Sequence, residues 1–280
     1  MPFSLDIGVY TIFIDNPFVD VLCSLSYNRL ERKLNVVNGT IKKLTFYSKI
    51  LHHTFDLHVY LPPHYSRLYT YHIAITQDGR DYFQFGKIAR KIEDILEEGA
   101  EETIVVGIPY PSVQQRRKWY HPDSADSKSY IQFLVKELLP FLEDTYKTSN
   151  LSYGRTLMGD SLGATISLLA ALKYPHSFAR LIMHSPFVND TVLQAAQRTN
   201  VWRSFEMYHT VGTEETRVET TDGNIQDFLK PNRTLHELLQ KGCDRYHYHE
   251  FRGGHLWKYW EKDLPDALRF MFTNDAGKES

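Results

Sequence analysis

The sequence predicts an α/β fold in which helices cover both faces of a mostly parallel central sheet. Short strand-like runs alternate with helical patterns from residue 38 onward, an order typical of parallel sheets. The run TIVVGIPY (103–110) is continuously apolar, as expected for a strand covered on both faces. No internal repeat or low-complexity tract competes with this interpretation.

The first half of the series contains three of the predicted strands and two of the predicted helices. The stretch HTFDLHVYLPPHY (53–65) alternates apolar and polar residues before a Pro-Pro pair, which predicts a strand followed by a turn. The stretch IARKIEDILEEG (88–99) places isoleucines at helical spacing and ends at a glycine. YHIAITQDG (71–79) and TIVVGIPY (103–110) are further predicted strands, and SYIQFLVKELLPFLEDTY (129–146) is a predicted helix.

The second half continues the alternation. Pro231 is expected to kink or interrupt one of its helices, because proline lacks the N–H that a helix interior needs. The predicted strands are RTLMG (155–159), ARLIMHSPF (179–187), RSFEMYHTVG (203–212) and RYHYHEFRG (245–253). The predicted helices are ATISLLAALKYP (164–175), NIQDFLKPNRTLHELLQKG (224–242) and WKYWEKDLPDALRFMF (257–272).

Residues 36–275 form the expected main domain, after an N-terminal extension at residues 1–35 that does not fit the alternating pattern. The chain has 280 residues, of which 42% are hydrophobic and 24% charged, so it can bury a large core. Its formal net charge is −2 and no block of like charges occurs. Neither nucleic acid nor an anionic membrane surface is therefore an expected partner.

The cysteine count and the N-terminus bear on the compartment. Cys23 and Cys243 are the only cysteines, which predicts free thiols in a reducing compartment. The sequence contains no run of 18 apolar residues, so it does not predict a membrane-spanning helix. The apolar part of the N-terminus has no basic residue before it and contains Asp6 and Asp15, unlike a secretory signal. We therefore expect a cytoplasmic protein.

The stretch TLMGDSLGATISLL (156–169) contains a candidate nucleophile. Ser161 lies in Gly-Asp-Ser-Leu-Gly, between a predicted strand and a predicted helix. In that context the turn projects the serine hydroxyl above the strand ends, and the glycines avoid crowding of neighbouring backbone. The alternative is a serine that only caps the helix. The order of strand, turn and helix favours Ser161 as a nucleophile.

A serine nucleophile needs a base, and the base needs an orienting acid. When the nucleophile lies in a turn between a strand and a helix, the acid and then the histidine come later in the sequence, in the order Ser, Asp or Glu, His. Of the seven histidines after Ser161, His255 follows the last predicted strand in a Gly-Gly loop that can bring an imidazole over the strand ends. His184 is a weaker candidate, and a loop histidine that caps the last helix is the alternative for His255.

Four acids follow the penultimate strand: Glu214, Glu215, Glu219 and Asp222. The acid of such a site lies just past the strand end, because it must reach the far side of the histidine ring. That position favours Glu214 or Glu215, and spacing does not separate these two.

An acyl-transfer site also needs N–H donors for the developing oxyanion, each worth about 3–4 kcal/mol of barrier. The residue after the nucleophile, Leu162, is the first expected donor. The stretch ITQDGRDYFQFG (75–86) turns sharply after a predicted strand, which makes Arg80 the second expected donor and Gly79 its alternative. A plain turn is the other interpretation of this stretch.

Taken together, these residues resemble the "putative esterase" family of α/β-hydrolases, which includes esterase D, enterochelin esterase and mycolyltransferases. The resemblance runs in family order over residues 38–272, and members usually lack a counterpart to residues 1–35. The matching stretches are LHVYLPPHY, TQDGRDYF, TIVVGIPYP, KELLPFLEDTY, LMGDSLGA, VGTEE and GGHLWKYW.

The resemblance implies an α/β-hydrolase fold with Ser161 as nucleophile and His255 as base. The family's Gly-Thr-x-Asp/Glu pattern matches residues 212–215, which implies Glu215 as the acid. The family's Asp-Gly turn matches residues 78–79, which implies Arg80 as the second oxyanion donor.

The expected function is that of a serine carboxylic-ester hydrolase that acts through an acyl-enzyme on a small-molecule ester, without cofactor or metal. The alternatives are a siderophore-lactone esterase, thioesterase or acyltransferase on the same scaffold, or a hydrolase fold kept for binding. Association with further copies of the chain is compatible with all of these. Segments 111–130 and 188–203 are expected to shape the pocket, with Arg116, Arg117 and Lys118 either meeting an anionic substrate or forming a solvated basic loop.

Overall fold

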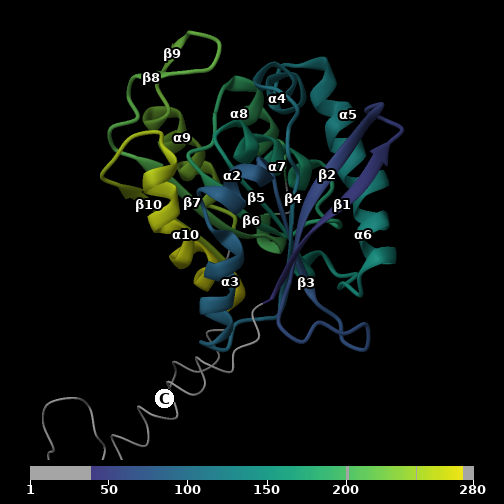
Figure 1. Cartoon of the computed structure of the whole chain (residues 1–280). Coiled ribbons are helices and arrows are strands. Elements are labelled where there is room, and N and C mark those ends of the chain that lie inside the picture. Colours follow the sequence, from purple (N-terminus) through teal and green to yellow (C-terminus); the bar gives the residue numbers. More distant parts are fainter. Residues whose placement is uncertain (1–38, 200–201, 244, 274–280) are drawn as a thin grey trace, which may run out of the picture. The chain divides into compact units, whose positions relative to one another are not determined.

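An eight-stranded sheet is the centre of the computed structural model, which describes residues 39–199, 202–243 and 245–273 (Figure 1). Its strand order is β1-β2-β4-β3-β5-β6-β7-β10. The β1–β2 and β2–β4 pairs are antiparallel, whereas the remaining neighbours, from β4 to β10, are parallel. The strands are β1 (Thr40–Ser48), β2 (His53–Leu61), β3 (His72–Thr76), β4 (Thr103–Gly107), β5 (Arg155–Asp160), β6 (Arg180–His184), β7 (Glu206–Gly212) and β10 (Arg245–Phe251).

Helices cover both faces of this sheet, which confirms the predicted α/β-hydrolase architecture. Helices α2, α3 and α10 pack against one face, and α5 to α9 pack against the other. The helices are α2 (Gly79–Gln84), α3 (Ile88–Leu96), α4 (Val113–Tyr120), α5 (Ala125–Phe133), α6 (Leu139–Thr145), α7 (Leu162–Lys173), α8 (Asp190–Gln197), α9 (Leu229–Leu239) and α10 (Trp257–Phe272). A two-stranded hairpin, β8 (Val218–Glu219) and β9 (Ile225–Gln226), stands apart from the sheet.

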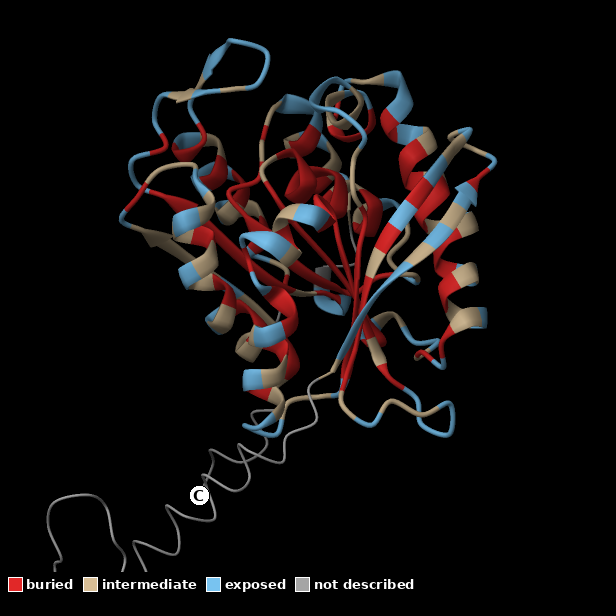
Figure 2. Cartoon of the chain, viewed as in Figure 1, coloured by how far each residue is buried: buried red, intermediate tan, exposed pale blue. Residues whose placement is uncertain are grey.

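The apolar strand runs supply side chains to both layers of the core. On β3, Ile73 and Ile75 belong to the layer under α5 to α9, whereas Ala74 belongs to the layer under α3 and α10. Successive residues of a strand point to opposite faces, so a run without alternation is what a doubly covered strand requires. Figure 2 shows the central strands buried and the edge strand β1 largely exposed.

Several segments differ from the sequence-based expectation. The predicted loop 111–130 contains α4 and the start of α5, because Ser112 caps α4 with its side chain while Trp119 and Tyr120 are buried. A π-helical turn at Leu134–Leu138 interrupts the predicted helix 129–146.

The predicted helix 224–242 begins only at Leu229, after β9. Pro231 lies in its first turn, where its missing N–H would have no helical partner, so it does not kink the helix. The proposed extension at residues 1–35 and Cys23 lie outside the described residues. Within those residues, no helix is long and apolar enough to cross a bilayer.

Candidate active site

Ser161 occupies the turn between β5 and α7 with φ 53° and ψ −124°, a conformation that costs free energy for any residue other than glycine. Its N–H donates to the carbonyl of His184 at 2.8 Å, and its carbonyl accepts the Thr165 hydroxyl at 3.1 Å. A side chain on Gly159 would collide with the backbone of Gly163, so this approach of strand and helix requires glycine. The turn presents the Ser161 hydroxyl at the carboxyl end of the parallel strands.

The Glu215 carboxylate, after β7, is fully buried and binds three groups. Its Oε2 lies 2.7 Å from Nδ1 of His255. Its Oε1 accepts the N–H of Gly212 at 2.8 Å and the hydroxyl of Ser185 at 2.7 Å. Glu214, the other acid that spacing left open, is exposed. Of the two neighbours, Glu215 is therefore the one that contacts His255.

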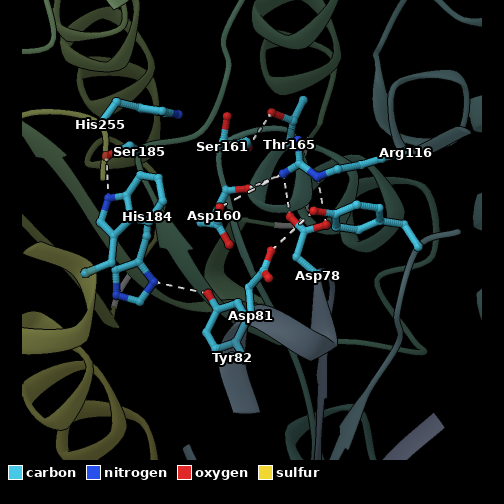
Figure 3. Close-up of polar contacts among 12 residues, drawn as sticks. Asp78, Asp81, Tyr82, Arg116, Asp160, Ser161, Thr165, His184, Ser185 and His255 are labelled. Atoms are coloured by element: carbon cyan, nitrogen blue, oxygen red, sulfur yellow. Dashed lines mark hydrogen bonds and ion pairs between the residues drawn. The ribbon is translucent and has the colours of Figure 1, made fainter. Parts of the chain in front are cut away.

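His255 lies in the loop between β10 and α10, with aromatic rings on two sides. The Phe228 ring centroid is 4.2 Å from the imidazole centroid, and the Trp260 ring meets it edge-on at 4.9 Å. Because Glu215 binds Nδ1, the other ring nitrogen is left to face the cavity. Figure 3 shows the imidazole of His255 directed toward Ser161, and no hydrogen bond joins the two side chains in the described chain.

Ser161 and His255 line one cavity of about 110 Å³. Segment 111–130 contributes Arg116, Arg117 and His121, in agreement with its expected role, whereas the described part of segment 188–203 contributes nothing. The β8–β9 hairpin, which was not predicted from the sequence, forms much of the remaining wall of the cavity. Its residues at the cavity are Val218, Glu219, Thr220, Thr221, Asp222 and Gln226.

Of the two expected oxyanion donors, Leu162 lines the cavity with Ser161 and Arg80 does not. Within the described chain, neither Leu162 nor Arg80 donates its N–H to a protein acceptor. Gly79, the alternative to Arg80, donates its N–H to the carbonyl of Ile108 at 2.8 Å. Of Gly79 and Arg80, Arg80 is therefore the one whose backbone N–H has no acceptor in the described chain.

Arg116 forms an ion pair with buried Asp78 to one side of Ser161, which corrects the interpretation of Arg116 as part of a solvated basic loop (Figure 3). Its Nε donates to Asp78 Oδ1 at 2.8 Å, and its Nη2 contacts Asp78 Oδ2. Nη2 also donates to the carbonyl of Asp160 at 3.3 Å and lies 4.0 Å from the Asp160 carboxyl. Burial, together with the nearby charge of Asp78, raises the pKa of Asp160 well above its usual range.

The rival histidines bind other partners. His184 Nε2 lies 3.1 Å from Asp263, and its Nδ1 lies 3.2 Å from the Tyr82 hydroxyl. His209 is fully buried against Asn232 at 2.7 Å, and burial lowers its pKa to about 4. Neither lines the cavity. Within the described residues, no group of three His, Cys, Asp or Glu side chains is placed to hold a metal ion.

Comparison with known proteins gives matches at the level of sequence family and of fold. The family described as "Putative esterase" matches residues 48–271. The "Uncharacterized protein YjcH" of Bacillus subtilis (strain 168) is 46% identical over 235 residues, which are 84% of this chain and 98% of that protein.

Solved esterases share the fold at much lower identity. A ferulic acid esterase superposes with a TM-score of 0.70 and 16% identity over 84% of this chain and 98% of its own. The enterobactin esterase of Shigella flexneri superposes with a TM-score of 0.69 and 15% identity over 82% of this chain and 59% of its own.

Proposed function

Because the chain belongs to the "Putative esterase" family, we propose that it is a serine carboxylic-ester hydrolase that forms an acyl-enzyme on Ser161. The observation that carries this proposal is the 2.7 Å contact between Glu215 and Nδ1 of His255, with His255 and Ser161 on one cavity. A carboxylate that fixes one imidazole nitrogen leaves the other free to act as a base on a nearby hydroxyl.

In the proposed reaction, Ser161 Oγ attacks the ester carbonyl carbon while His255 Nε2 takes the hydroxyl proton. The N–H groups of Leu162 and Arg80 hold the oxyanion that forms. The bond to the alcohol then breaks as His255 returns the proton to the leaving oxygen. Water, deprotonated by His255, attacks the acyl-enzyme, releases the carboxylic acid and restores Ser161.

The decisive experiment compares the wild type with Ser161→Ala on short p-nitrophenyl esters. We expect Ser161→Ala to lower kcat by about 10⁴- to 10⁶-fold, because the nucleophile is lost, while thermal melting barely changes. Ser167→Ala is the matched control, since Ser167 is a buried serine on the helix that follows Ser161 and does not line the cavity. If Ser161→Ala keeps more than a tenth of the activity, the assignment is wrong.

The substrate panel should also contain a siderophore trilactone and acyl-thioesters. The fold is shared with an enterobactin esterase and a ferulic acid esterase, which favours including both an aromatic ester and a trilactone. Labelling of Ser161 by a fluorophosphonate tests the remaining alternative, a hydrolase fold kept for binding. A chain that neither hydrolyses any of these substrates nor reacts with the probe is not a serine hydrolase.

A further inference from the structure

A buried serine behind the proposed catalytic acid has no role in the mechanism so far. Ser185 directly follows β6 and is fully buried. Its hydroxyl lies 2.7 Å from Glu215 Oε1 and 3.1 Å from the indole Nε1 of Trp260. Figure 3 shows Ser185 beside His255.

The chemistry of the three groups fixes the direction of both hydrogen bonds. An indole N–H can only donate, so Trp260 donates to the oxygen of Ser185. An ionised carboxylate can only accept, so the Ser185 hydroxyl donates to Glu215. A donor bonded to a charged acceptor makes one of the stronger hydrogen bonds in proteins. The Ser185 hydroxyl is therefore aimed at the carboxylate by a donor behind it.

The backbone of Ser185 adopts a strained conformation that places its hydroxyl against Glu215. Its φ is 47°, in the left-handed region that residues other than glycine, asparagine and aspartate rarely adopt. The Ser185 N–H donates to the carbonyl of Thr210 at 2.7 Å, which ties the turn to β7. The neighbouring His184 carbonyl accepts the N–H of Ser161. One turn after β6 thus contacts both the nucleophile turn and the acid.

We propose that Ser185 is a positioning residue for the reaction: with Trp260 behind it, Ser185 holds the Glu215 carboxylate in the orientation that fixes His255. This inference rests on the proposed function. Trp260 also packs its ring edge against His255, so the indole supports the imidazole directly and, through Ser185, the acid. Neither Ser185 nor Trp260 lines the cavity, so both act through Glu215 and His255 rather than on substrate.

The test uses Ser185→Gly, a substitution that separates chemistry from folding. Glycine adopts φ 47° without strain, which offsets part of the stability lost with the hydroxyl. We expect kcat to fall roughly 10- to 100-fold, the range for loss of a hydrogen bond to a charged group, with KM unchanged. The rate of fluorophosphonate labelling at Ser161 should fall by the same factor.

Two further variants and one spectroscopic measurement sharpen the result. Trp260→Phe keeps an aromatic ring but removes the indole donor, so it should lower kcat less than Ser185→Gly does. Because both act through Glu215, the double variant should lower kcat no further than Ser185→Gly alone. The low-field NMR resonance of the proton between His255 Nδ1 and Glu215 should shift or broaden in Ser185→Gly. Ser167→Ala, the buried serine away from the cavity, should leave rate and resonance unchanged.

The outcomes separate this role from the proposed function. If the wild type hydrolyses esters but Ser185→Gly keeps its kcat and its resonance, the positioning role is wrong and the hydrolase assignment stands. The role is also wrong if the activity loss merely follows the loss of folded protein. A wild type that neither hydrolyses nor labels overturns the proposed function and the role of Ser185 with it.

Discussion

Buried carboxylates lie on both sides of Ser161, in different surroundings. On one side, Glu215 is a single acid whose oxygens bind an N–H, a hydroxyl and an imidazole. On the other side, Asp78 and Asp160 lie around one guanidinium, that of Arg116. In Figure 3, Ser185 and His255 lie on one side of Ser161 and Arg116 lies on the other.

The difference lies in how each group of side chains satisfies its charge. The oxygens of Glu215 all have donors, whereas Asp160 Oδ1 is buried with no hydrogen-bond partner in the described chain. One guanidinium cannot neutralise two buried carboxylates at once, and burial raises the pKa of Asp160 well above its usual range. We infer that the Glu215 side orients a reacting group, whereas the Arg116 side supports the nucleophile turn by charge pairing.

The largest effect is expected on the Glu215 side. Glu215→Gln keeps the size of the side chain but removes the charge that orients and stabilises the His255 imidazole. We expect kcat to fall by about 10⁴-fold, as for the corresponding acid of serine proteases, with little change in melting temperature. Steady-state kinetics on a p-nitrophenyl ester measures this effect.

Glu214→Gln is the matched control for that substitution. The Glu214 side chain is exposed, and its backbone N–H donates to the carbonyl of Gly253 at 2.9 Å. Its activity should therefore stay within about twofold of the wild type, since surface substitutions of this kind have small effects. Equal losses in the two variants would contradict the assignment of the acid and would remove the basis of the comparison between the two sides.

The two sides also differ in how far the sequence predicts them. Ser161, His255 and the Glu214–Glu215 pair were located because each follows a recognisable strand in a local pattern. The fold class was predictable for the same reason, since the periods of strands and helices are local. The choice of Glu215 came from a family resemblance, because two adjacent residues have the same spacing to everything else.

Ser185 and Arg116 were not predictable in this way. The role of Ser185 depends on a positive φ and on partners that lie 30 and 75 residues further along the chain. Arg116 lies in a polar stretch that resembles a surface loop, yet its partner Asp78 is 38 residues earlier and buried. The sequence signals that could have identified them, a serine at a strand end and an arginine before buried aromatics, are common in residues without such roles.

The next largest effect is expected on the Arg116 side and concerns stability. Arg116→Met leaves Asp78 and Asp160 buried without a counter-charge, and removing one partner of a buried pair costs about 3–5 kcal/mol. The loss should be greater at pH 8 than at pH 5, because at the lower pH Asp160, whose pKa burial raises, can take up a proton and no longer add a second buried charge. Urea unfolding at both pH values measures it.

Arg117→Met is the control on the neighbouring residue. Arg117 pairs with Asp222 at 2.6 Å, but its side chain is 37% exposed, so solvent screens the pair and it contributes little to stability. Arg116→Lys should fall between the two, because lysine keeps the charge but not the two-pronged geometry. Similar stabilities for Arg116→Met and Arg117→Met would mean that the Arg116 side is not held by charge pairing.

The smallest effect is expected for Asp160→Asn, and it tests the raised pKa of Asp160. Because burial and Asp78 raise the pKa of Asp160 in the folded state, the folded chain holds a proton that the unfolded chain loses above about pH 4. The contribution of Asp160 to wild-type stability therefore falls as the pH rises. Asparagine does not ionise in either state, so the stability of Asp160→Asn relative to the wild type should rise from pH 5 to pH 8.

Asp222→Asn is the control, because the pKa of Asp222 is shifted in the opposite direction. A hydrogen bond from Thr220 lowers the pKa of exposed Asp222 to about 2, so this carboxylate is ionised from pH 5 to pH 8. The difference in stability between Asp222→Asn and the wild type should therefore stay constant over this range. A constant difference for Asp160→Asn as well would mean that Asp160 is ionised beside Asp78.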